Sequence, residues 1–261
     1  MTGLNAGSGE ATPLPEFRWI SASATHVGKV RKLNEDSLLE YPQIGLWAVA
    51  DGVGGASAGD WASAFTVQTL SQIAKPENMP GFLAEVYDQL SAVNGALRRQ
   101  AEAGAHQAIA TTIVALLFAD GRFACTWAGD SRLYLMRDGQ FRQVNRDHSA
   151  VQELVDQGVI QASEARHHPR GNVVTRAVGA FENLDLEMTQ DRLCEDDIFV
   201  LCSDGLTKTM EDAEIAALLN RPIDQAVKIL MQTALDRGAP DNVTVIAVKV
   251  LTDDESTREI A

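Results

Sequence analysis

The segment TTIVALLFADGRFACTWAGDSRLYLMRDG, residues 111–139, decides the fold. Apolar and β-branched residues fill three short runs in it, and short polar turns separate them, which predicts three consecutive strands. The turns are Asp120-Gly121 and Gly129-Asp130. Asp-Gly pairs are typical of tight hairpins, so an antiparallel meander is expected. The predicted strands are 111–119, 122–128 and 132–137.

On both sides of the meander, the sequence predicts strands and helices in separate groups along the chain. Further strands are expected at 17–25, 45–50, 184–189, 197–202 and 243–250. Apolar residues at three- and four-residue steps predict helices at 58–73, 82–97, 212–219 and 223–235. Consecutive strands followed by consecutive helices favour an α+β fold, with helices packed outside antiparallel sheets, over a parallel βαβ fold.

Composition limits the classes of function. The 261 residues are 45% hydrophobic, which suits one domain at 17–251 between a disordered tail, 1–16, and a polar tail, 252–261. With 36 acidic against 22 basic residues, the net charge of −14 argues against nucleic acid as a partner and disfavours a nuclease. The sequence contains no apolar run of about 18 residues and no basic leader, so we expect a cytoplasmic protein without membrane insertion.

Aspartates recur where the expected strands end or begin. They are Asp51, which Gly52 follows, and Asp130, Asp204 and Asp241. Carboxylate oxygens are the ligands that Mg²⁺ and Mn²⁺ prefer, and a glycine after a ligand lets the backbone carbonyl approach the ion. The pattern indicates a metal site. For any single Asp-Gly pair, a simple turn is the stronger alternative.

A second charged segment surrounds Arg31, which precedes Glu35 and Asp36. An arginine fork can bind two phosphate oxygens at once, while the acids hold a metal ion or its water. An exposed charged turn is the alternative interpretation. None of the three cysteines is followed by arginine six residues later, which excludes a cysteine phosphatase.

Together these segments resemble the motifs of the metal-dependent protein phosphatases, the protein phosphatase 2C family. In chain order the motifs are residues 28–37, 48–55, 110–112, 129–132, 147–149, 201–206 and 241–244. The resemblance covers about residues 17–250, with residues 149–171 resembling the family's flap. Residues 27–60 look especially like bacterial phosphatases associated with type VI secretion.

The resemblance implies a four-layer αββα sandwich, in which helices flank two antiparallel sheets and a metal site lies at one end. It implies two Mn²⁺ or Mg²⁺ ions and a weaker third. Asp51 would bridge the first two ions. The first ion would also be held by Asp204 and Asp241, the second by Glu35 and the Gly52 carbonyl, and the third by Asp130 with Asp204.

The implied activity is hydrolysis of phosphoserine and phosphothreonine in proteins. A hydroxide bridging the two ions would attack phosphorus directly, with Asp36 orienting the water and Arg31 binding the phosphate. Val53 stands where animal members carry a histidine, which leaves the general acid unassigned. The implied protein is a monomer that opposes a bacterial serine/threonine kinase. A pseudophosphatase that binds a partner without turnover is the alternative, and its sign would be loss of Arg31 or of a metal-binding aspartate.

Overall fold

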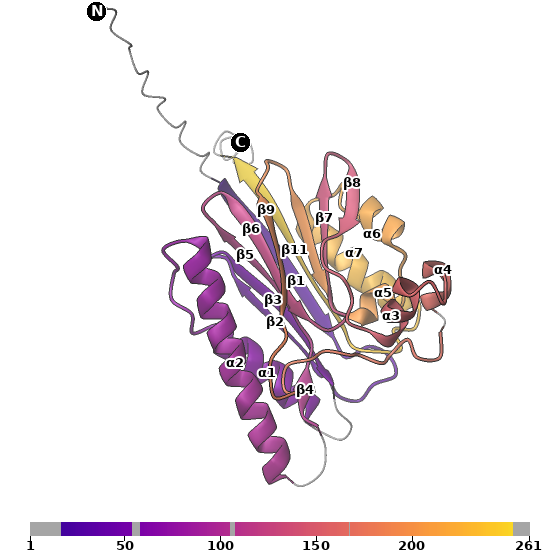
Figure 1. The fold of residues 1–261 in the computed structure, drawn as a ribbon. Coiled ribbons are helices and arrows are strands. Elements are labelled where there is room, and N and C mark those ends of the chain that lie inside the picture. Colours follow the sequence, from indigo (N-terminus) through magenta and orange to yellow (C-terminus); the bar gives the residue numbers. More distant parts are fainter. Residues whose placement is uncertain (1–16, 54–57, 105–107, 167, 253–261) are drawn as a thin grey trace, which may run out of the picture.

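Figure 1 presents the computed structural model, which describes residues 17–53, 58–104, 108–166 and 168–252. The predicted tails, 1–16 and 252–261, lie outside these ranges, except that Thr252 ends the last strand. Within the described ranges no helix is long and apolar enough to cross a membrane.

The strands form two antiparallel sheets. The first sheet contains, in spatial order, β1 (Phe17–His26), β11 (Val243–Thr252), β10 (Ile198–Cys202), β7 (Arg132–Arg137) and β8 (Gln140–Gln143). The second contains β2 (Asp36–Tyr41), β3 (Leu46–Val53), β5 (Ile113–Ala119), β6 (Arg122–Ala128) and β9 (Glu187–Arg192), with β4 (Ala110–Thr111) paired to the end of β3.

The sheets stack face to face around a shared apolar core. Successive side chains of a strand point to opposite faces. In β3, Trp47 and Val49 therefore join the core between the sheets, whereas Ala48 packs with the outer helices. Trp47 contacts Phe118 edge to face, with ring centroids 5.0 Å apart. Burial on both faces explains why β3 reads as a nearly continuous apolar run.

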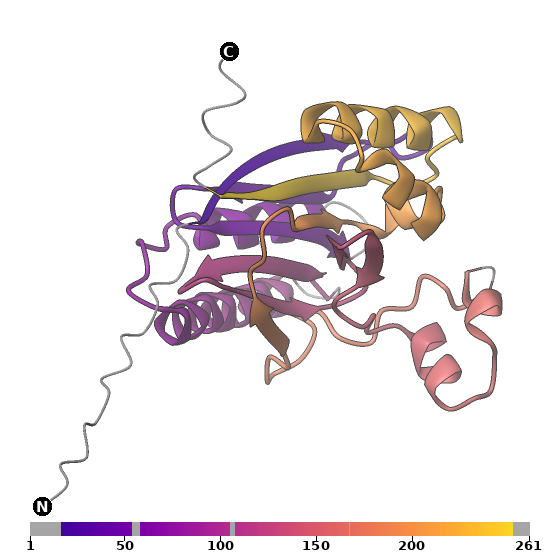
Figure 2. The same cartoon turned by 90° about the horizontal axis from the view of Figure 1, so that it is seen from above.

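Helices cover the two outer faces of the sandwich (Figure 2). The helices α1 (Gly59–Leu70) and α2 (Met79–Ala103) pack on the second sheet, and α6 (Asp212–Leu218) and α7 (Ile223–Asp236) pack on the first. Asn78 caps α2 by accepting a hydrogen bond from Gly81 N at 2.8 Å. The short helices α3 (Ala150–Asp156) and α4 (Ala162–Ala165) project beyond the sandwich, and α5 (Asp204–Thr207) follows β10.

This architecture confirms the expected α+β sandwich of two antiparallel sheets flanked by helices. The meander strands end within one residue of their predicted bounds, apart from a break at Thr112 that separates β4 from β5. Two strands, β2 and β8, were not predicted. Both are short, and β8 has an alternately exposed, polar sequence, so neither carries a strong apolar signal.

Candidate metal centre

The predicted acidic residues gather at one end of the sandwich. Asp36 opens β2 and pairs directly across the sheet with Asp51 in β3. Asp204 lies two residues after β10, and Asp241 lies two residues before the antiparallel strand β11. Asp130 occupies the connection between β6 and β7. The antiparallel pairing therefore places strand ends from distant parts of the sequence at the same edge.

Hydrogen bonds tie the two sheets together at this edge. Ser203 Oγ, from the first sheet, donates to Asp36 Oδ2 of the second sheet at 2.7 Å. The same hydroxyl accepts from Thr244 N at 3.0 Å. Glu35 N donates to Asn242 Oδ1 at 2.8 Å. The Asp36 carboxylate thus has one oxygen fixed by a neighbour that is itself fixed by the backbone.

Two glycines allow α1 to approach the acidic edge closely. A Cβ atom on Gly52 would lie 2.2 Å from the Gly59 carbonyl oxygen. A Cβ atom on Gly59 would lie 2.5 Å from Glu35 Oε1 and 3.0 Å from the Gly52 carbonyl oxygen. Both oxygens therefore face the same glycine. This arrangement brings together the two groups that were predicted to hold the second ion.

Asp60, in the first turn of α1, belongs to the same edge and was not predicted. Its Oδ1 atom is buried and has no hydrogen-bond partner. Burial raises the pKa of Glu35, Arg31 lowers it, and the charge of Asp60 raises it again. An acidic residue in the first turn is common because its charge interacts favourably with the helix dipole, so no sequence signal favoured a metal role for Asp60.

The carboxylates repel one another because they share a buried space. Burial, followed by the charges of Asp36, Asp204 and Asp130, raises the pKa of Asp51 well above its usual range. Burial raises the pKa of Asp36 to about 7, although the hydrogen bonds from Ser203 and Thr244 oppose the shift. Burial and Asp204 raise the pKa of Asp130 to about 8. Positive charge at this edge would relieve the repulsion.

Two side-chain cations lie among these acids. Arg31 Nε lies 3.0 Å from Asp241 Oδ1, and Arg31 Nη2 donates to Asp241 Oδ2 at 3.1 Å. Lys208 Nζ lies 2.6 Å from Asp204 Oδ2 and 3.0 Å from Asp241 Oδ2. The Arg31 side chain is 49% exposed, so its guanidinium remains accessible to a ligand from solvent.

The donor set fits divalent cations. Asp36 Oδ1, Asp60 Oδ1 and Asp204 Oδ1 are buried without a hydrogen-bond partner, and leaving such oxygens unpaired is costly. Within the described ranges, no three His, Cys, Asp or Glu side chains are already grouped around a point that could hold one ion. That result is compatible with Mg²⁺ chemistry, because Mg²⁺ binds through few carboxylates and keeps several waters.

A cavity of about 590 Å³ opens beside the acidic edge. The described residues of the flap, 149–166 and 168–171 with α3 and α4, contribute to its lining, and so do Asp130, Asp204 and Lys208. Arg166 Nη2 ties the flap to the sandwich by donating to Thr207 O at 2.7 Å and to Met210 O at 3.1 Å. The cavity gives a ligand a route to Asp130 and Asp204.

All eight predicted site residues therefore lie at one end of the fold. They are Arg31, Glu35, Asp36, Asp51, Gly52, Asp130, Asp204 and Asp241. The prediction missed Asp60 and Lys208, and it missed the supporting roles of Ser203 and Asn242.

Comparisons with known proteins agree with this arrangement. Residues 25–243 match the family model described as protein phosphatase 2C. The chain is 36% identical over 232 residues to the serine/threonine protein phosphatase PstP of Mycobacterium tuberculosis, covering 88% of this chain and 45% of PstP. It is 32% identical over 236 residues to the serine/threonine phosphatase stp of Listeria innocua, covering 86% of this chain and 93% of that protein. The chain thus spans less than half the length of PstP.

Solved structures give the same result. The structure of PppA, described as a key regulatory component of T6SS in Pseudomonas aeruginosa, matches with a TM-score of 0.83 and 42% identity, covering 90% of this chain and 98% of PppA. The PstP catalytic domain in complex with two manganese ions matches with a TM-score of 0.82 and 34% identity, covering 90% of this chain and all of that one. On the match over residues 25–243 and these similarities, the chain belongs to the protein phosphatase 2C family.

Proposed function

We propose that this protein is a metal-dependent phosphatase that hydrolyses phosphoserine and phosphothreonine in proteins. The observation that carries the proposal is the acidic edge itself, where buried carboxylate oxygens without partners lie beside an accessible arginine. Family membership supports the reaction class, and the two manganese ions bound to PstP support the choice of cofactor.

In this proposal the acidic edge would hold two Mn²⁺ or Mg²⁺ ions. Asp51 would contribute to both sites, and Asp204 with Asp241 would complete the first. Glu35 and the Gly52 carbonyl would hold the second, which agrees with their shared contact with Gly59. When bound, the ions supply the Lewis acidity that activates a water for direct attack and neutralises charge on the phosphate.

The protein's own groups orient the reactants. Ser203 fixes Asp36 Oδ2, so Asp36 Oδ1 is free to accept a proton of the attacking water. The water oxygen forms a bond to phosphorus as the bond from phosphorus to the serine or threonine oxygen breaks. Arg31 leaves Asp241 and binds two phosphate oxygens with its fork. Val53 has no acidic proton to donate, so the proton for the leaving oxygen comes from a water or from another side chain.

We propose that the protein acts as a monomer in the cytoplasm and opposes a bacterial serine/threonine kinase, with phosphorylated proteins as substrates. The 42% identity with PppA supports a regulatory role in type VI secretion. The pseudophosphatase alternative is disfavoured, because Arg31 and the metal-binding aspartates are all present.

Replacing the bridging carboxylate tests the proposed activity. Asp51→Asn keeps the shape of the side chain but removes its charge, so phosphate release from a phosphothreonine peptide at saturating Mn²⁺ should fall by more than about 100-fold. Treating the wild type with EDTA should have the same effect. Asp224→Asn is the matched control, because Asp224 is 58% exposed and lies on α7. Near-normal turnover by Asp51→Asn, or by the EDTA-treated wild type, would contradict the mechanism.

Arg31 should act on the phosphate and not on metal retention. Arg31→Lys keeps the charge but loses the fork, so kcat/KM for the phosphopeptide should fall about 10- to 100-fold, the size expected for a charge-assisted hydrogen bond. Mn²⁺ affinity, measured by calorimetry, should stay the same or increase, because Arg31 competes for Asp241. Arg98→Lys, in an exposed ion pair on α2, is the control. Weaker Mn²⁺ binding with unchanged kcat/KM would show that the assignment is wrong.

The stability of the metal-free protein should fall as pH rises. Folding raises the pKa of Asp36 from 3.8 to about 7 and that of Asp130 from 3.8 to about 8. From pH 3.8 up to these folded-state values, the folded chain holds protons that the unfolded chain has released. Stability is therefore lost through this window. Between pH 7 and 8.5, Tm should drop by about 2–4 °C, which corresponds to 1 kcal/mol in a domain of this size.

Burial and the charge of Arg176 lower the pKa of His148, so its contribution to stability increases with pH and cannot cause the predicted loss. Saturating Mg²⁺ should raise Tm more at pH 8.5 than at pH 7, because the ions bind the deprotonated carboxylates. Asp130→Asn should flatten the pH dependence of the metal-free protein. A Tm that is constant or rises over this range, measured by circular dichroism, would argue against raised pKa values for the buried carboxylates of the acidic edge.

A further inference from the structure

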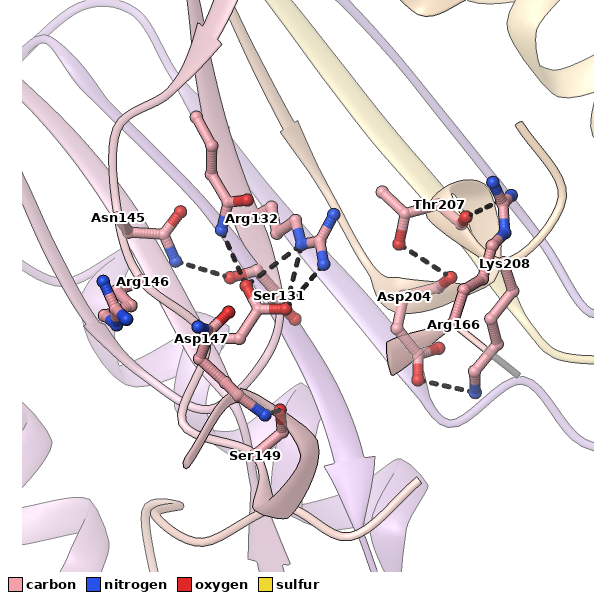
Figure 3. A network of polar contacts seen from close by, with 12 residues as sticks. Ser131, Arg132, Asn145, Arg146, Asp147, Ser149, Arg166, Asp204, Thr207 and Lys208 are labelled. Atoms are coloured by element: carbon pink, nitrogen blue, oxygen red, sulfur yellow. Dashed lines mark hydrogen bonds and ion pairs between the residues drawn. The ribbon is translucent and has the colours of Figure 1, made fainter. Parts of the chain in front are cut away.

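Lys208 is placed to act on the metal centre. It directly follows the single turn of α5 that begins at Asp204, and its backbone N donates to Asp204 O at 2.7 Å. The side chain then reaches back, so that Nζ lies 2.6 Å from Asp204 Oδ2 and 3.0 Å from Asp241 Oδ2. Figure 3 shows Lys208 and Asp204 joined in this way. One ammonium therefore links two carboxylates at the same edge of the sheet, one just after the end of β10 and the other just before the start of β11.

The same ammonium also acts electrostatically on Asp130. Asp130, Asp204 and Lys208 all line this cavity, and the charge of Lys208 opposes the rise in the Asp130 pKa. The Lys208 side chain is only 27% exposed, and the neighbouring carboxylates keep it charged by raising its pKa against the effect of burial. A fixed positive charge thus lies on the side of the centre that contains Asp130.

This position conflicts with the third ion that the family resemblance implied. That ion was assigned to Asp130 together with Asp204. Asp204 Oδ2 is already held by Lys208, and Asp204 Oδ1 is the oxygen left for the first ion. Asp130 would remain as the one predicted ligand of a third ion, and that ion would lie close to an ammonium of like charge. The residues on this side do not fit a third divalent cation.

We propose that Lys208 is a resident cation of the metal centre, which neutralises the Asp130 and Asp204 side of the cleft in place of a third divalent ion. The inference rests on the proposed function, since it assumes two ions at Asp51. Lys208 is a positioning residue here: it holds Asp204 and Asp241 side by side and limits the centre to two exchangeable ions.

The number of bound ions tests this role without an activity assay. Chelator-treated protein is dialysed to equilibrium against Mn²⁺, and bound metal is counted per chain. The wild type and Lys208→Arg, which keeps the charge, should each bind two ions. Lys208→Met, which removes the charge at similar length, should bind three. Adding Asp130→Asn to Lys208→Met should return the number to two. Lys228→Met is the matched control, because Lys228 is 76% exposed in a surface pair with Asp224, and it should bind two.

Thermal unfolding supplies an independent readout. Without metal, Lys208→Met should have a lower Tm than Lys228→Met, because Asp204 and Asp241 lose their shared cation. Should Lys208→Met fail to fold, Lys208→Gln serves as the second variant, since its amide can still donate to Asp204 while carrying no charge, and it too should bind three ions.

Three ions in the wild type would overturn the inference, and so would two ions in every neutral variant at position 208. These outcomes differ from failure of the proposed function. A wild type that binds no Mn²⁺, or that binds Mn²⁺ without releasing phosphate from phosphopeptides, would refute the proposed phosphatase. A wild type that is active with two ions, beside a Lys208→Met protein that also binds two, would refute the role of Lys208 alone.

Discussion

Mutual repulsion among buried carboxylates is the constraint on which the active end of this fold depends. Asp36 and Asp51 face each other across a strand pair of the second sheet, and Asp204 and Asp241 approach them from the first sheet. The sandwich can hold these charges together because its two sheets are packed around a large apolar core and bonded through Ser203. Apolar burial in that core therefore offsets the unfavourable free energy of the clustered carboxylates until cations bind. Such local destabilisation is common at functional sites.

Most of the fold and most of the site residues could be predicted from the sequence. The meander at 111–139 was predictable because its turns are Asp-Gly and Gly-Asp pairs between apolar runs. Asp51, Asp130, Asp204 and Asp241 were recognisable because each stands at a strand end next to a turn signal. Spatial convergence was the part that needed the family resemblance, since spacing along a chain does not determine which strand ends meet.

Other features could not be read from the sequence, for physical reasons. The strand β2 begins with the buried carboxylate Asp36 and is otherwise only partly buried, so its pattern does not alternate clearly. Asp60 and Lys208 look like ordinary residues at helix ends, and their importance arises from contacts with residues far away in the chain. Gly59 resembles any glycine at the start of a helix, although the absence of a side chain there leaves the space that Glu35 occupies.

The central claim is that this edge binds two divalent ions that share Asp51. Anomalous scattering from crystals grown with Mn²⁺ tests it most directly, because each ion gives its own peak and its position identifies its ligands. The account predicts two peaks at the acidic edge, both within coordination distance of the Asp51 carboxylate, one beside Asp204 and the other beside Glu35. A single peak away from Asp51, or no peak at this edge in crystals saturated with Mn²⁺, would contradict it.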